Sequence, residues 1–135
     1  MGTNNGVIGN QNVAVGDVNK VTGDQNVLKG NLNGVAGNGN GVDGSVNLVI
    51  GDGNGIEGNY NALQGDLNKL LGSGNQITGN MNGVQGDLNL IKNGNNNVMG
   101  GNQNIVNEGS YNGVLGNANY VEGNGNLMSG DVNQL

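Results

Sequence analysis

One seven-residue unit accounts for nearly the whole chain: glycine, asparagine or aspartate, any residue, asparagine, any residue, an aliphatic residue, any residue. The unit occurs nineteen times in 135 residues, begins at Gly2 and keeps its frame without interruption to Lys92. A fixed internal period is typical of repeat architectures, in which each unit packs against its neighbours. The sequence therefore predicts a single heptad-repeat domain spanning residues 2–135, without distinct capping units.

Three positions of the unit are nearly invariant. Position 6 is apolar throughout, and position 1 is glycine except where Asn93 takes its place, with Asn96 as the fourth residue of that unit. Two single-residue insertions, at about Gly100 and Glu108, interrupt the frame on either side of the unit 101–107, and we expect them to form a paired bulge in successive turns that widens one coil. Position 4 is always asparagine, and the uninterrupted part of this series includes Asn12, Asn19, Asn26, Asn33, Asn40, Asn47, Asn54, Asn61 and Asn68.

A helix does not fit this pattern. A coiled coil needs apolar residues at two heptad positions, and this unit offers one. Each unit also contains a glycine, which costs about 1 kcal/mol in a helix interior. The last four positions instead alternate as a strand does, so that positions 4 and 6 face one way and positions 5 and 7 the other.

Two units then make one coil of strand, turn, strand and turn, because the glycine-containing pair between strands has the chemistry of a turn. The sequence predicts an all-β fold, a β-solenoid or β-roll of about nine to ten coils of 14–15 residues. At ~4.8 Å per coil the rod is roughly 45 Å long. Its core consists of inward Val, Ile and Leu, with two apolar residues from each coil.

The inward asparagines are expected to stack as ladders, with each amide bonding to the next coil. A buried amide without a partner costs about 1–3 kcal/mol, so asparagine at every fourth position is most easily explained by a ladder that is fully hydrogen-bonded. In the alternative interpretation these residues are exposed turn formers.

Position 3 suggests a surface for association. On one edge this position is occupied in successive coils by Val18, Leu32, Val46, Tyr60, Gly74 and Leu88. We expect the apolar members to protrude as a broken ridge for lateral association, since exposed apolar stripes mark interaction sites. In the alternative interpretation they fold over their own corner and are buried.

The composition offers little for catalysis. The chain has no histidine and no cysteine, and its serines occupy turn or outward positions. The aspartates at position 2 interchange with asparagine, which favours a role in turns over acid–base chemistry or calcium binding. With four lysines, no arginine and a net charge of −6, the chain lacks the basic face that nucleic acids require. We expect no enzyme, no cofactor, no metal site, no nucleic-acid partner and no membrane insertion.

The unit G-x-x-N-x-V-x resembles, over essentially the whole chain, the repeat of the ryegrass-type ice-recrystallisation-inhibition (antifreeze) proteins. The resemblance implies a β-roll of 14–15-residue coils with an inward valine core, internal asparagine ladders and a flat ice-binding sheet. In that family the ice face carries Thr, Ser and Val beside the inward valine. Thr22 and Thr78 are the threonines at those positions here.

Three functions follow as hypotheses. The leading one is a structural protein that stacks head to tail with copies of itself into filaments, because a repeat without caps can template a further coil. The second is an ice-binding protein whose partner is the ice surface. The third is a fragment of a larger surface adhesin. The repeat begins directly after Met1 without a signal peptide, and an extracellular or cell-surface location is our working hypothesis.

Overall fold

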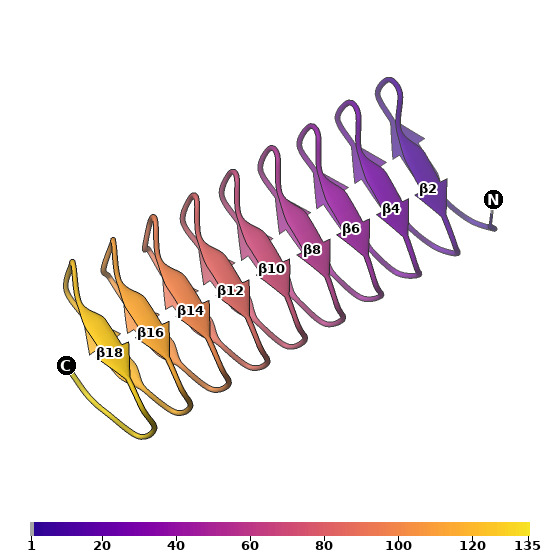
Figure 1. The fold of residues 1–135 in the computed structure, drawn as a ribbon. Coiled ribbons are helices and arrows are strands. Elements are labelled where there is room, and N and C mark those ends of the chain that lie inside the picture. Colours follow the sequence, from indigo (N-terminus) through magenta and orange to yellow (C-terminus); the bar gives the residue numbers. More distant parts are fainter. Residues whose placement is uncertain (1) are drawn as a thin grey trace.

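A computed structural model describes residues 2–135 as a stack of flattened coils. The coils follow one another in a straight row from the N-terminal to the C-terminal end (Figure 1). Eighteen strands of three residues each form two nine-stranded sheets on opposite sides of the rod, and all strand pairs within them are parallel. The β-solenoid predicted from the repeat is confirmed.

Alternate strands belong to alternate sheets. Sheet A contains β1 (Gly6–Ile8), β3 (Lys20–Thr22), β5 (Gly34–Ala36), β7 (Leu48–Ile50), β9 (Ala62–Gln64), β11 (Gln76–Thr78), β13 (Leu90–Lys92), β15 (Ile105–Asn107) and β17 (Tyr120–Glu122). Sheet B contains β2 (Val13–Val15), β4 (Val27–Lys29), β6 (Gly41–Asp43), β8 (Gly55–Glu57), β10 (Lys69–Leu71), β12 (Gly83–Gln85), β14 (Val98–Gly100), β16 (Gly113–Leu115) and β18 (Leu127–Ser129).

The register of the sheets follows the repeat. Val35 lies opposite Val49, fourteen residues later, so each inward residue stacks on its equivalent in the next coil. Where the insertions fall the spacing is fifteen residues, as between Leu90 and Ile105, and it returns to fourteen between Gly113 and Leu127. The position-6 side chains from Val21 to Met128 are all buried and form a single narrow core between the sheets.

Two corners connect the sheets. Corner A leads into the strands of sheet A, and corner B leads into those of sheet B. Position 1 requires glycine at both corners, as Gly51 illustrates. Its φ is +128°, and a Cβ there would lie 2.1 Å from the carbonyl oxygen of Gly65 in the next coil. A side chain at this position would therefore force neighbouring coils apart.

The frame predicted for one unit is wrong. Gly94, not Asn93, occupies position 1, and Asn97 is the buried ladder residue, whereas Asn96 lies half-buried at the corner with a φ of +57°. Met99 accordingly points inward, and Val98 is exposed. The extra residue is therefore Asn93 and not Gly100, because only glycine fits the close approach between coils.

The second insertion, Glu108, is placed correctly. Asn93 and Glu108 have nearly the same backbone conformation, with φ of +53° and +52°, and lie fifteen residues apart between sheet A and sheet B strands. Their corners stack, since the Glu108 N–H donates to the carbonyl of Lys92 at 2.8 Å. The two insertions are paired as predicted, but they lie at the same corner of two successive coils, with two repeat units between them instead of one.

Candidate assembly interface

The inward asparagines form a ladder in which each amide joins three successive coils. The Asn47 backbone N–H and Nδ2 both donate to Oδ1 of Asn33, at 3.0 and 3.1 Å, and Nδ2 also donates to the carbonyl of Gly58 at 2.8 Å. Oδ1 of Asn47 in turn accepts two hydrogen bonds from Asn61. This side chain therefore makes every hydrogen bond available to an amide.

The same pattern extends through both sheets. The ladder asparagines from Asn19 to Asn119 are buried, while Asn12, in the first complete coil, is half-buried. Within residues 2–135 every buried side-chain nitrogen and oxygen has a hydrogen-bond partner. The predicted ladder is confirmed, and the alternative of exposed turn formers is wrong.

A second ladder runs along the outside of both corners. The side-chain oxygen at position 2 accepts a hydrogen bond from the position-2 backbone N–H of the preceding coil, as when Asp52 Oδ1 accepts from Asn38 and Asp66 Oδ1 from Asp52. Serine does the same, since Ser45 Oγ accepts from Asn31. Sequence reasoning treated this position only as a turn former. The missed signal is that all nineteen residues carry a side-chain oxygen.

The two ladders point in opposite directions. In the inner ladder a coil offers its side-chain oxygen to the backbone of the following coil, as Asn33 does to Asn47. In the outer ladder the oxygen faces the preceding coil, as Asp52 faces Asn38. Each coil-to-coil interface is therefore directional, with a fixed set of donors and acceptors on either side.

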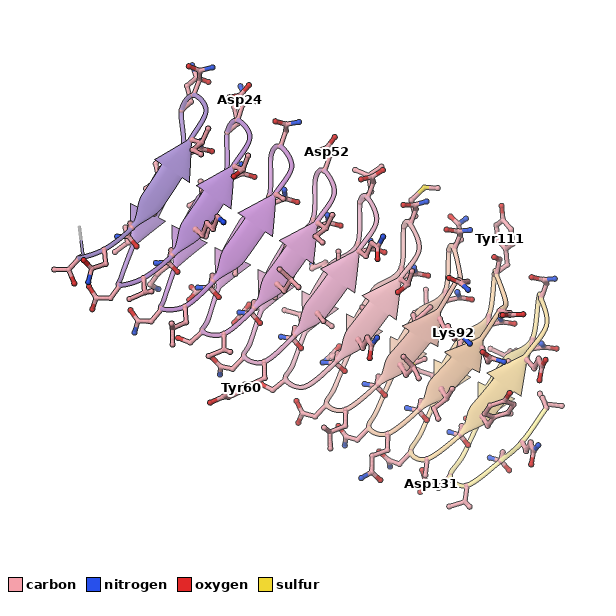
Figure 2. The ribbon with its side chains drawn as sticks, turned by 180° about the vertical axis from the view of Figure 1, so that it is seen from behind. Asp24, Asp52, Tyr60, Lys92, Tyr111 and Asp131 are labelled. Atoms are coloured by element: carbon pink, nitrogen blue, oxygen red, sulfur yellow. The ribbon has the colours of Figure 1, made fainter. Side chains whose placement is uncertain are left out.

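The predicted ridge lies on corner A. Its members, Val18, Leu32, Val46, Tyr60 and Leu88, expose between 38 and 70% of their surface, so the alternative in which they are buried at their own corner is wrong. Figure 2 shows Tyr60 projecting from one corner of the rod, and Tyr111 projecting from the opposite one. Gly74 interrupts the ridge.

The ridge residues share an unusual backbone conformation. Val18, Val46 and Tyr60 have φ of +60°, +62° and +58°, in the left-handed region. Such a φ is costly for a β-branched residue, whereas glycine or asparagine adopts it readily. The corner is held there by hydrogen bonds between coils, including the one from the Val46 N–H to the carbonyl of Asn31 at 2.9 Å.

Four charged side chains lie on neighbouring strands of sheet B, namely Lys29, Asp43, Glu57 and Lys69. Lys29 and Asp43 form an exposed ion pair at 3.1 Å. Beside them lies a shallow hollow of about 600 Å³, lined also by Glu57 and Lys69, over the glycines of β6 and β8.

At corner A of the first coils, Asp17 accepts hydrogen bonds from the backbone N–H and the hydroxyl of Thr3. These bonds, the backbone one first, hold the pKa of the Asp17 carboxyl below its ordinary value of 3.8.

Three of the terminal strands have an open edge. β1 begins sheet A, and β2 and β18 end sheet B, so each of these three strands pairs on one side only. The far side of β17, the last strand of sheet A, is paired with residues 133–135, since Tyr120 forms a parallel bridge to Gln134. The inward Val7 of β1 is consequently 45% exposed, whereas its equivalent Val21 in the next coil is fully buried.

Side chains that could hold a metal ion do not converge in the described residues. Nowhere in residues 2–135 do three or more Asp or Glu side chains gather as a metal site would require. Ser45, Ser73 and Ser110 accept backbone hydrogen bonds in the outer ladder. The same residues contain no helix of the length and apolarity needed to cross a membrane.

Comparisons with known proteins return little. No family model matches the chain, and no curated protein matches its sequence. Among solved structures, the polySia specific acetyltransferase NeuO aligns over 98% of this chain and 71% of its own, with 15% identity and a TM-score of 0.30. A similarity at that level supports no inference about function.

Proposed function

We propose that this chain is a structural protein that stacks head to tail, coil on coil, into β-solenoid filaments. The observation that carries the proposal is the complementarity of the two end coils. At one end, among residues 2–135, the backbone N–H groups of Asn5 and Asn12 have no side-chain acceptor of the kind that each later ladder residue has. At the other end Asn126 and Asn133 carry the corresponding Oδ1 atoms, to which no donor within residues 2–135 is bonded.

The outer ladder supports the same arrangement. The backbone N–H groups of Asn124 and Asp131 have no acceptor within the described chain, whereas Ser110 and Asn117 donate to the side chains of these two residues. At the first coil the side chains of Thr3 and Asn10 lie where acceptors for such donors belong. A second copy seated on the last coil would reproduce an interior interface, and Val7 would become buried like Val21.

Edges of this kind are templates for pairing with another chain. Burying an exposed valine contributes roughly 1.5–3 kcal/mol at most, and the coil-to-coil hydrogen bonds add to that. Because the added coil meets a rigid, preformed surface, little conformational entropy is lost on docking. We further propose that the ridge on corner A bundles filaments laterally.

Negative-stain electron microscopy of the purified 135-residue chain tests the stacking. We expect filaments that lengthen between about 1 and 100 μM protein. Val7→Asp places a carboxylate in the buried seam of the junction and should prevent filaments. Val13→Asp is the matched control, because Val13 belongs to the same end of the rod but faces outward. Short rods of roughly 45 Å at every wild-type concentration would overturn the proposal, as would filaments of Val7→Asp.

Ice binding is the alternative proposal, and it rests on the resemblance of the repeat. Thr22 and Thr78 lie in the same row of sheet A, four strands apart, or about 19 Å. Ala36, Ile50 and Gln64 stand between them. An ice-recrystallisation assay at micromolar protein separates the two functions: inhibition that survives Val7→Asp and is lost in Thr22→Lys would favour ice binding over filament formation.

A further inference from the structure

In the middle of the rod the two sheets differ in charge. Outward positions of β5, β7, β9 and β11 in sheet A carry no charged side chain, and this uncharged area lies between Lys20 and Lys92. In the same part of the rod sheet B carries Lys29, Asp43 and Glu57, followed by Lys69. A chain with a net charge of −6 thus presents one face that a like-charged copy can approach.

The surface of this uncharged area is uneven, with a protrusion between two hollows. Leu48 and Ile50 of β7 are 53% and 45% exposed and stand as a knob. On one side a hollow of about 310 Å³ lies over Gly34 and Ala36 of β5, and on the other a hollow of about 110 Å³ lies over β9. A Cβ at Gly34 would be 3.4 Å from Leu48 Cδ1, so the glycine leaves this hollow open right up to the knob.

We propose that sheet A packs face to face against sheet A of a second copy, with the two rod axes antiparallel. A twofold axis parallel to the strands and midway between β5 and β7 sets β5 of each copy against β7 of the other. Leu48 then enters the space over Gly34, and Ile50 the space over Ala36, in both directions. Such an interface is isologous and closes at two copies.

Charge also selects this axis over the neighbouring one. An axis between β7 and β9 would set β3 against β13 and bring Lys20 beside Lys92 of the other copy. With the axis between β5 and β7, β3 lies against β9, Lys20 lies over Ala62, and Lys92 falls outside the overlap. The two sheets would then lie about 10 Å apart, which is the usual spacing of packed sheets.

The overlap is modest. Six strands at ~4.8 Å give a contact about 25–30 Å long and one short strand wide, which is smaller than the roughly 1,200 Å² interface of a stable complex. We therefore expect a monomer–dimer equilibrium that shifts over micromolar concentrations. Salt should strengthen it, because salt screens the repulsion between two acidic copies while the contact itself is apolar. The proposal does not depend on head-to-tail stacking, so it is tested in the Val7→Asp background.

Sedimentation equilibrium measures the dimer directly. Leu48→Lys should weaken dimerisation at least tenfold by placing a charge in the contact, and Val27→Lys is its control, since Val27 is also 53% exposed but lies on sheet B. Gly34→Val should weaken dimerisation by filling the hollow. Gly41→Val is its control, as a position-5 glycine on sheet B with open space around it.

The outcomes are distinct. A dimer that is lost in Leu48→Lys and Gly34→Val and kept in both controls supports the proposal. Monomers at all concentrations up to about 1 mM, or a dimer that tolerates all four substitutions, overturn it. Species that grow beyond two copies and survive Leu48→Lys would belong to another contact and would also count against the sheet A pairing. Failure of filament formation has no bearing on these measurements.

Discussion

Oδ1 of Asn47 accepts hydrogen bonds from both the backbone N–H and the side-chain Nδ2 of Asn61, at 3.0 and 3.1 Å. The two residues lie fourteen positions apart in the sequence and one coil apart in the rod. Because Asn47 also donates to Asn33 and Gly58, one amide stabilises two coil-to-coil interfaces.

Replacing this amide should be costly. Asn47→Ala leaves two donors of Asn61 and the carbonyl of Gly58 without partners in a dry interior, so we expect a loss of at least about 3 kcal/mol in the free energy of unfolding. Urea denaturation followed by circular dichroism measures the loss. Asn133→Ala is the control: this residue is exposed and its side chain bonds only to Asn119, so about 1 kcal/mol should be lost. Equal losses at the two positions would contradict a ladder that joins three coils.

Glycines at different positions of the repeat should differ sharply in how well they tolerate replacement by alanine. Gly51→Ala puts a Cβ 2.1 Å from the carbonyl oxygen of Gly65 at a φ of +128°, and we expect it to lose more than about 3 kcal/mol or fail to fold. Gly55→Ala meets nothing within 4 Å and has ordinary backbone, so it should be neutral or stabilising by up to about 1 kcal/mol. Thermal unfolding of both variants checks the contrast, and similar melting temperatures would refute the close approach of coils at position 1.

The apolar residues of the ridge should lower the stability of the protein, because their backbone has a positive φ. Val46→Asn places a residue that readily adopts a positive φ at a corner where φ is +62°, and we expect stability to rise by about 1 kcal/mol. Lateral bundling in micrographs should decrease in the same variant. Val98→Asn is the control, since Val98 is exposed in a strand of ordinary conformation and asparagine there should not stabilise. A stabilised Val46→Asn that still bundles would rule out the ridge as the lateral contact.

Low pH should remove the stabilisation that the hydrogen bonds between Thr3 and Asp17 give to corner A. Its folded pKa is depressed, so the hydrogen bonds from Thr3 stabilise the protein fully above the unfolded pKa, near 3.8. That contribution is lost as the pH falls from there through the folded pKa. A ¹³C NMR titration of the Asp17 carboxyl should have its midpoint below 3.8. Thr3→Ala should raise the midpoint only part of the way, because the backbone N–H is the larger cause. A midpoint unchanged by Thr3→Ala would show that the hydroxyl does not contribute.

Most of the fold could be predicted because the repeat constrains it so strongly. The alternation of Asn47 and Val49 within one strand determines which side faces inward, and the glycine at position 1 determines where the chain turns. The segment from Asn93 to Gly100 was misassigned because Asn93, Asn95, Asn96 and Asn97 are all asparagine and Val98 and Met99 are both apolar. The residue types therefore fit the repeat in two frames, with either Asn93 or Gly94 at position 1. Only the space between coils, which admits glycine alone, assigns position 1 to Gly94.

The surface features were harder to predict from the sequence. The oxygen at position 2 was visible in every unit, yet its acceptor role depends on the backbone N–H of the preceding coil, which no local turn rule includes. Similarly, Lys29 and Leu48 are both outward strand residues in the sequence. That Lys29 lies among charged side chains and Leu48 in the uncharged part of sheet A emerges once strands are assigned to sheets A and B.

The amides that connect three coils also have a mechanical consequence. A force that bends the rod, or slides one coil across another, must distort the bonds of Asn47 to Asn33 on one side and to Gly58 on the other at the same time. Strain is thereby spread over neighbouring coils instead of concentrating at one joint. We expect the rod to behave as a stiff beam whose softest point is the corner widened by Asn93 and Glu108.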